Sequence, residues 1–294
     1  MSSKQQPDFD VIAIGAGFAG LALIHHIREA GLSIRVFDKA DDVGGTWTWN
    51  RYPGAMTDSE SYYYCLTFSK ELLQEWSWTR RYPDWKETHD YFRFVADRCN
   101  MWPDIQLNTE IVSAEYQKDS AQWKVTTKGG EPYTCKYFIS AMGMISEPEI
   151  PRIKGMDTFK GPLFHSARWP EGLDYKGKRV GIIGAGATTV QMLPVMSQDA
   201  ESVTVFHRTE QRHEDTCARS TNRVTHRTCA AMNVHNIMRE TKLFHRDHRN
   251  DRKGFVDFPE IDIVFGPASL LERLLHRRHR GGREVFRLMR VARG

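Results

Sequence analysis

Apolar and polar residues near the N-terminus are arranged in blocks that predict a strand, a helix and a second strand. Residues 9–14 form a mostly apolar run, which is typical of a buried parallel strand. Residues 21–30 have helical spacing, and Gly31 is a natural residue for the end of a helix. A second apolar run, residues 34–37, ends on Asp38. This order of elements is typical of an α/β fold.

The turn between the first strand and the helix has the spacing G-x-G-x-x-G. Gly15 suits the tight turn, Gly17 lets a pyrophosphate approach the backbone, and Gly20 lets the helix pack on the strand. Asp38 can accept hydrogen bonds from ribose hydroxyls. A lone motif of this kind arises by chance, but its place between strand, helix and acidic residue predicts a dinucleotide site.

A second copy of the pattern lies downstream. We predict strands over 179–183 and 202–206 and a helix over 190–197. Gly184 and Gly186 repeat the first two glycines of the motif. Two such folds in one chain imply two nucleotides, and flavin with reduced nicotinamide is the natural pair because hydride passes between them.

The second copy differs from the first at two places. Thr189, preceded by Thr188, replaces the third glycine, and its small side chain must fit where helix and strand approach closely. Arg208 and Thr209 follow the last strand, where the first copy has an acid. A cation neutralises a 2′-phosphate, so we expect NADP rather than NAD here, the alternative being a solvated surface arginine.

The composition is that of a folded, reduced protein. With 294 residues and 40% apolar residues, the chain can form two domains. Its apolar runs are too short to predict a membrane span or a signal peptide, so we expect a cytoplasmic protein. The five cysteines form no C-x-x-C pair, and no disulfide framework is expected.

Charge divides the chain near Glu210. Residues 1–210 hold 23 Lys+Arg against 27 Asp+Glu, whereas residues 211–294 hold 18 against 10, and 16 of those 18 are arginines. A basic amphipathic helix over 268–280 suits a nucleic-acid or membrane surface, but we favour a solvated helix and expect no nucleic-acid partner. An out-of-frame or truncated tail is a further hypothesis.

Histidine and cysteine pairs in this tail suggest zinc only weakly. The pairs His213 with Cys217 and His226 with Cys229 do not have the spacing of a standard zinc finger. We therefore predict no metal site.

Two longer motifs resemble those of a known family. Phe159, Gly161, His165, Trp169 and Pro170 match the signature F-x-G-x-x-x-H-x-x-x-W-P of the Baeyer-Villiger monooxygenases. Residues 44–58 resemble the second signature of the same family, G-G-x-W-x-x-x-x-Y-P-G-x-x-x-D. The resemblance covers residues 8–210. It favours this group over the related flavin-containing N- and S-monooxygenases, which carry Tyr or Phe in place of Trp169-Pro170.

The resemblance implies two Rossmann-like dinucleotide-binding domains, one for FAD and one for NADP, the second of them incomplete. The expected divisions are 1–150 for the FAD-binding domain, 151–210 for the linker signature with the first part of the NADP-binding domain, and 211–294 for the basic tail. The signature around His165 is expected at the join between the two domains.

The resemblance also implies roles for individual residues. Asp58 and His165 are the expected catalytic residues. The expected FAD contacts are Thr46, Trp47, Trp49, Asp58, Tyr64 and Ile111, and the expected NADP contacts are Met56 and Thr57. In the family an arginine pairs with the aspartate that matches Asp58, but no residue of this sequence can be matched to it.

The implied reaction uses FAD, NADPH and O2 to insert one oxygen atom next to a ketone carbonyl, giving an ester or lactone. A role in secondary-metabolite biosynthesis is a further expectation. Two alternatives stay open: a catalytically inactive remnant, and a flavoprotein that oxidises NADPH and releases hydrogen peroxide.

Overall fold

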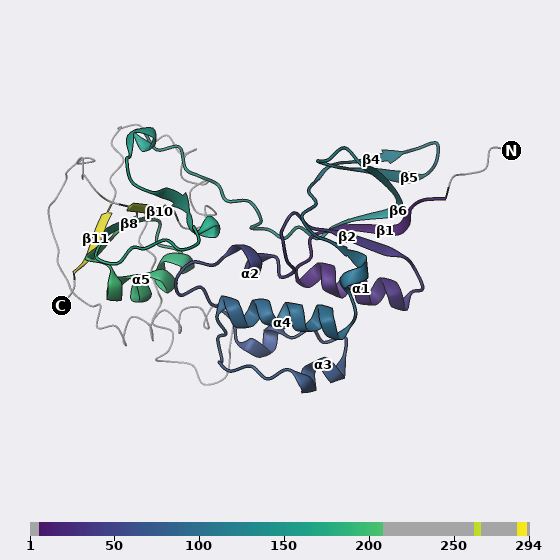
Figure 1. The fold of residues 1–294 in the computed structure, drawn as a ribbon, viewed down its shortest axis with the longest axis horizontal. Helices are drawn as coiled ribbons and strands as arrows, with labels where there is room; N and C mark the ends of the chain where they lie inside the picture. The colour runs from purple at the N-terminus through teal and green to yellow at the C-terminus, as the bar shows by residue number, and fades with distance from the viewer. Residues whose placement is uncertain (1–5, 208–261, 266–286, 293–294) are drawn as a thin grey trace, which may run out of the picture. The chain divides into compact units, whose positions relative to one another are not determined.

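The computed structural model describes residues 6–207, 262–265 and 287–292 (Figure 1). The chain divides into two compact units. The first unit comprises Met1–Trp49 and Ser61–Ser146, and the second comprises Asn50–Glu60 and Glu147–Gly294. The chain therefore enters the second unit at Asn50, returns to the first at Ser61 and leaves it again at Glu147.

The first unit is built on a six-stranded sheet. Its strands are β1 (Phe9–Ile14), β2 (Ile34–Phe37), β3 (Ile105–Gln106), β4 (Ile111–Gln117), β5 (Gln122–Thr127) and β6 (Pro132–Ser140), in the order β3-β2-β1-β6-β5-β4. β1 pairs in parallel with β2 and β6, and β2 with β3, whereas β5 is antiparallel to β4 and β6. Its helices are α1 (Phe18–Glu29), α2 (Thr46–Trp49), α3 (Lys70–Glu75) and α4 (Trp85–Arg98), with short 3-10 turns at Ser61–Tyr64 and Trp102–Asp104.

Strand β1 supplies both faces of this sheet with apolar side chains. Val11 and Ala13 belong to the cluster that α1 and α4 cover, and both helices lie on one side of the sheet (Figure 1). Ile12 points the other way and packs with Phe37, Val125 and Cys135. Because successive strand residues face opposite sides, a strand buried on both faces has the continuous apolar run seen in the sequence.

The second unit has a five-stranded sheet in the order β11-β9-β8-β10-β7. Its strands are β7 (Leu163–His165), β8 (Arg179–Ile183), β9 (Ser202–His207), β10 (Asp262–Phe265) and β11 (Arg287–Ala292), and its helix is α5 (Ala187–Asp199), with 3-10 turns at Met156–Thr158 and Ser166–Arg168. All neighbours are parallel except β11, which is antiparallel to β9. Ile182, Val203 and Met192 are among the residues that form its core.

The predicted α/β class with two Rossmann-like units is confirmed, and the predicted strands 9–14, 34–37 and 179–183 have the predicted bounds. Both glycine-led helices begin three residues earlier than predicted, because each starts immediately after the second glycine of its turn. The nucleotide assignments of 1–150 and 151–210 stay predictions. Of the 211–294 tail, only β10 and β11 lie within the described residues.

Candidate functional site

The first glycine-rich turn leaves no room for a side chain at two of its three glycines. Gly15 has φ +105°, and a Cβ there would meet the carbonyl oxygen of Ala141. A Cβ on Gly20 would meet the carbonyl oxygen of Gly15. At Gly17, by contrast, the nearest atom to a Cβ would be the Cα of Gly45 at 3.5 Å, an ordinary contact. Packing therefore explains Gly15 and Gly20, whereas Gly17 has room for a Cβ at ordinary contact distance.

The second turn has more room at its matching glycine. A Cβ on Gly186 would find no atom within 4 Å, and Gly184 has φ +114°. Thr189 occupies the place of the third glycine, is buried, and donates its hydroxyl to the carbonyl oxygen of Gly184 at 2.9 Å. The expectation that a small side chain fits here is confirmed, and the hydroxyl adds a hydrogen bond that a glycine cannot make.

The helices that follow these turns begin without a side-chain cap. Gly17 precedes α1 and Gly186 precedes α5, and neither N-cap residue has a side chain that could accept from the first N–H groups of its helix. In α3 and α4, by contrast, Ser69 and Asp84 accept from first-turn N–H groups at 3.3 and 3.0 Å. First-turn N–H groups that no cap side chain satisfies can bind an anionic phosphate. The residues present therefore fit a dinucleotide at each turn.

Asp38 is buried at the end of β2 and holds the first turn. Its Oδ2 accepts from Ala16 N at 2.7 Å and its Oδ1 from Ala40 N at 2.8 Å. Each carboxylate oxygen has two acceptor sites, so these bonds leave capacity for a ribose hydroxyl. The ribose contact stays a prediction, and the structure adds a second task for this carboxylate, which is to fix the turn.

The two glycines of the second signature pack against the first turn. Gly44 N donates to Ala16 O at 3.0 Å, and a Cβ on Gly45 would lie 3.2 Å from the Cα of Gly17. In the helix that follows, Thr48 donates its hydroxyl to Val43 O at 2.7 Å. The first two residues of the second signature therefore lie at the predicted FAD turn.

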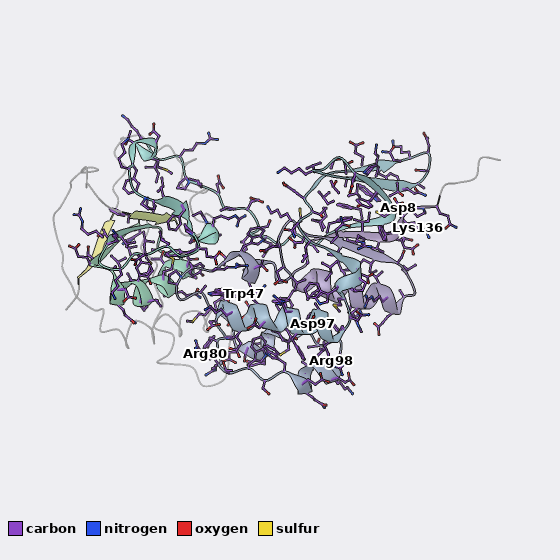
Figure 2. The ribbon with its side chains drawn as sticks, in the orientation of Figure 1. Asp8, Trp47, Arg80, Asp97, Arg98 and Lys136 are labelled. Carbon is purple, nitrogen blue, oxygen red and sulfur yellow. The ribbon has the colours of Figure 1, made fainter. Side chains whose placement is uncertain are left out.

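The predicted FAD contacts divide between two packing environments. Trp47 on α2 (Figure 2) is buried with its ring 5.6 Å from that of Tyr64, at 70°. Thr46 begins the same helix, and Trp49 ends it with its ring 5.9 Å from Lys39 Nζ. Ile111 instead begins β4 and packs on the cluster around Phe37. Trp47 and Tyr64 therefore lie together, while Ile111 belongs to the other core.

In the second unit, the segment Asn50–Glu60 lies against helix α5. The amide of Gln191 accepts from Tyr52 Oη at 2.8 Å and donates to Met56 O at 2.9 Å. Gly54 has φ +79°, and a Cβ there would meet the carbonyl oxygen of Gln191 and lie 3.0 Å from Val195 Cγ2. One buried amide and one glycine thus fix this segment on the helix that follows the second glycine-rich turn.

Tyr52 interacts with two of the predicted site residues, Thr188 and Asp58. Burial raises the pKa of Tyr52 above its ordinary value, a hydrogen bond with Thr188 opposes that rise, and the charge of Asp58 adds to it. Asp58 itself is exposed, while Thr57 beside it is fully buried and donates to Ser59 O at 2.8 Å. The structure therefore brings Met56, Asp58 and the second turn into one site.

His165 is only 4% exposed and lies at the end of β7, which pairs in parallel with β10. Its Nδ1 accepts from Ala167 N at 3.1 Å, so in a neutral ring the proton is on Nε2. Downstream, Trp169 packs edge-on against Phe164, with ring centroids 5.3 Å apart. The signature is therefore an ordered strand and turn within the second unit.

Two predicted residues cannot be placed in this site, and two residues of the site were not predicted. Arg208 and Thr209 lie outside the described residues. Tyr52 and Gln191 were given no role from the sequence. A glutamine within the apolar residues 190–196 was the available signal for Gln191, since a buried amide requires polar partners.

No described helix is long and apolar enough to cross a membrane.

Comparison with known proteins identifies the family. The profile described as Flavin-binding monooxygenase-like matches residues 9–224. Cyclohexanone 1,2-monooxygenase of Acinetobacter sp. is 44% identical over 209 residues, which is 71% of this chain and 38% of that protein. A Baeyer-Villiger monooxygenase of Pseudooceanicola batsensis is 45% identical over 205 residues, 69% and 38% of the two chains. Phenazine N-monooxygenase of Lysobacter antibioticus is 45% identical over 212 residues, 72% and 39%.

Solved structures give the same result. Cyclohexanone monooxygenase from Rhodococcus sp. Phi1 bound to NADP+ is 43% identical with a TM-score of 0.67, covering 69% of this chain and 38% of that one. OTEMO in complex with FAD and NADP is 40% identical with a TM-score of 0.67, covering 70% and 40%. The chain spans about two fifths of the length of these proteins. The resemblance to Baeyer-Villiger monooxygenases is thereby confirmed, and the chain belongs to the flavin-binding monooxygenase-like family.

Proposed function

We propose that the chain provides the FAD- and NADPH-binding turns of a Baeyer-Villiger-type monooxygenase, which inserts one oxygen atom of O2 next to a ketone carbonyl. The observation that carries this proposal is the docking of Asn50–Glu60 on α5 through Gln191. That docking joins the second family signature to the second glycine-rich turn.

The two uncapped helix starts have separate tasks. The first-turn N–H groups of α1 bind the pyrophosphate of FAD, and those of α5 bind that of NADPH. Gly17 and Gly186 let the phosphates approach because neither position carries a side chain. When bound, FAD with NADPH supplies the hydride transfer and oxygen activation that no side chain provides.

The chain's own residues then orient the reacting groups. Tyr52 and Gln191 hold the segment that carries Asp58, and the exposed carboxylate of Asp58 is available to accept hydrogen bonds from a bound nucleotide. A carboxylate disfavours a neighbouring anion, so Asp58 needs a cationic partner while the ketone reacts. The resemblance implies an arginine for this task.

N-oxygenation is the second candidate reaction. Phenazine N-monooxygenase matches this chain at 45% identity, as high as the Baeyer-Villiger monooxygenase named above. The equal identities therefore leave the oxygen acceptor open between a carbonyl carbon and a nitrogen atom. The substrate, a place in secondary metabolism and the cytoplasmic location stay predictions.

The first test is the visible absorption spectrum of the purified chain with FAD, followed by anaerobic titration with NADPH. We expect a bound-flavin spectrum that bleaches as NADPH is added. A spectrum of free flavin only, with no bleaching, would contradict the proposal and favour an inactive remnant.

Two matched variants test each turn separately. Gly17→Ala adds a Cβ that the protein accommodates at 3.5 Å from Gly45, so we expect a folded protein that binds FAD more weakly. Gly186→Ala adds a Cβ into open space, so we expect FAD binding to persist and bleaching by NADPH to weaken. Equal effects of both variants on FAD binding would oppose the assignment of separate sites.

Aerobic NADPH consumption distinguishes the reactions. Faster NADPH consumption with a cyclic ketone, together with formation of a lactone, would support Baeyer-Villiger oxidation. A rise only with a phenazine, giving an N-oxide, would support the second candidate. Substrate-independent consumption with release of hydrogen peroxide would indicate an NADPH oxidase.

A further inference from the structure

Helix α1 carries three metal-ligand side chains near its C-terminal end, outside the site described above. The ligand atoms of His25, His26 and Glu29 all lie within 4.8 Å of one another. His25 is 25% exposed, His26 is 61% exposed and Glu29 is 63% exposed. An ion therefore has direct access to all three from solvent.

The carboxylate of Glu29 lies equally close to both imidazoles and is hydrogen-bonded to His26. Glu29 Oε2 lies 3.3 Å from His25 Nε2 and 3.3 Å from His26 Nδ1. Charge-assisted N–H···O bonds are shorter, about 2.7–2.9 Å. A tetrahedral zinc ion with ligand bonds of about 2.0–2.1 Å separates neighbouring ligand atoms by about 3.3–3.4 Å. The two separations between Glu29 and the histidines match that spacing.

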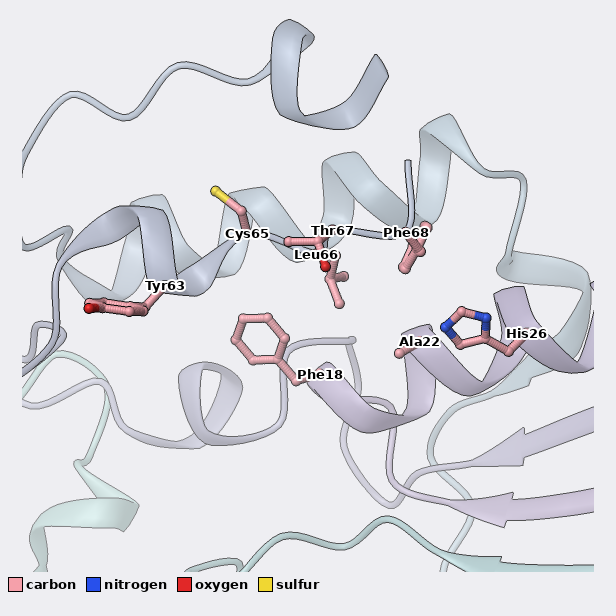
Figure 3. A pocket seen from close by; sticks show the side chains of 8 residues that line it. All are labelled: Phe18, Ala22, His26, Tyr63, Cys65, Leu66, Thr67 and Phe68. Carbon is pink, nitrogen blue, oxygen red and sulfur yellow. The ribbon is translucent and has the colours of Figure 1, made fainter. Parts of the chain in front are cut away.

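One aromatic ring holds both imidazoles in place. The His25 ring stacks on Phe68, with centroids 4.2 Å apart and an interplanar angle of 15°. His26 approaches the same ring at 6.3 Å and 77°. Figure 3 shows His26 of α1 and Phe68 on opposite sides of a pocket of about 500 Å³. Because packing already restricts these rings, less side-chain entropy is lost when a ligand binds.

We propose that His25, His26 and Glu29 bind a divalent transition-metal ion of the Zn²⁺ class, with water completing the coordination. Imidazole nitrogen with one carboxylate favours Zn²⁺, Ni²⁺ or Cu²⁺ over Mg²⁺ and Ca²⁺, which prefer oxygen ligands. The C-terminal end of a helix carries partial negative charge, which favours a cation there. The ligands are distinct from the residues of both glycine-rich turns.

Histidine footprinting of the full chain tests the site directly. The chelator-treated protein is modified with diethyl pyrocarbonate at neutral pH, with and without Zn²⁺, and the modified histidines are mapped by mass spectrometry. We expect Zn²⁺ to protect His25 and His26 together. Protection confined to histidines elsewhere in the chain, or no protection at either residue, would overturn the proposal.

A pair of glutamate variants tests the third ligand. Glu29→Gln removes the carboxylate with almost no change in helix propensity, and Glu115→Gln removes an exposed carboxylate of β4 as the control. We expect Glu29→Gln to weaken Zn²⁺ protection of His25 and His26 by about 10- to 100-fold, and the control to leave it unchanged. Equal protection in both variants would exclude Glu29 as a ligand and refute the three-ligand site.

Discussion

The two glycine-rich turns solve the same packing problem in different ways. In the first unit, Gly20 faces the carbonyl oxygen of Gly15, and any side chain would collide with it. In the second unit, Thr189 faces the carbonyl oxygen of Gly184 and donates a hydrogen bond to it. Where a helix approaches a turn this closely, the position can lack a side chain, as at Gly20, or carry one that donates a hydrogen bond to the turn, as at Thr189.

The two turns also differ in how far apart in the sequence the residues lie that hold the nearby backbone in place. Asp38, which fixes the first turn, lies 22 residues from Ala16 in the sequence. Gln191, which holds the segment beside the second turn, lies 139 residues from Tyr52. The first site depends on local sequence, and the second depends on a contact between distant parts of the chain.

Replacing Gly20, the third glycine of the first turn, is expected to have the largest effect on stability. Gly20→Thr places a side chain against the Gly15 carbonyl in a packed core, which should cost about 3 kcal/mol of unfolding free energy. Urea unfolding followed by tryptophan fluorescence reports this, because seven of the eight tryptophans belong to the first unit. An unchanged urea midpoint would mean that the first turn accommodates threonine as the second turn does.

Replacing Gln191 tests the contact between this residue and the segment Asn50–Glu60. Gln191→Leu removes the donor to the Met56 carbonyl and one of the two hydrogen-bond partners of the Tyr52 hydroxyl, which should cost about 2 kcal/mol. Hydrogen exchange of the α5 peptides measures this in the second unit. Adding Tyr52→Phe should recover part of the loss, since removing both partners is less costly than removing one. Additive losses would show that the bond contributes nothing.

Replacing the hydroxyl in the second turn should have a smaller effect. Thr189→Val keeps the shape of the side chain but removes the donor to the Gly184 carbonyl, at a cost of about 1 kcal/mol. Hydrogen exchange of the same peptides gives the measurement, with the unsubstituted chain as the reference. A neutral Thr189→Val would show that steric fit alone suffices here.

The smallest effect concerns acid stability of the first unit. The hydrogen bond from Lys136, with further bonds from Ser33, lowers the pKa of Asp10 to about 2 from 3.8. This carboxylate therefore contributes stability above about pH 4 that is lost as the pH falls through about 2. Asp10→Asn should flatten that part of the stability profile, and Asp119→Asn in an exposed turn should not. Identical profiles for Asp10→Asn and the unsubstituted chain would contradict this.

Much of the framework could be predicted because its causes are local. The continuous apolar run of β1 follows from burial on both faces, and the turn glycines follow from backbone geometry at Gly15 and Gly20. The helix starts were placed three residues late because apolar spacing does not show that Gly17 and Gly186 act as N-caps.

The site beside α5 could not be predicted in the same way. Residue 52 and residue 191 share no periodic pattern, so their contact depends on the tertiary fold. The family signature identified the segment that carries Asp58 without indicating what holds it. The ring contacts of His25 and His26 with Phe68 were missed for the same reason, since residue 68 lies outside the helix that carries both histidines.

The grouping of Asn50–Glu60 with the second unit has a consequence for synthesis on the ribosome. Translation adds about 5–20 residues per second, so Gln191 is made about 7–28 s after Tyr52, which precedes it by 139 residues. During that interval the first unit can complete its sheet through β6, while this segment waits without its helix. A nascent chain paused before residue 187 therefore carries a folded first unit and an undocked Asp58 segment, which limited proteolysis of stalled ribosome complexes would detect.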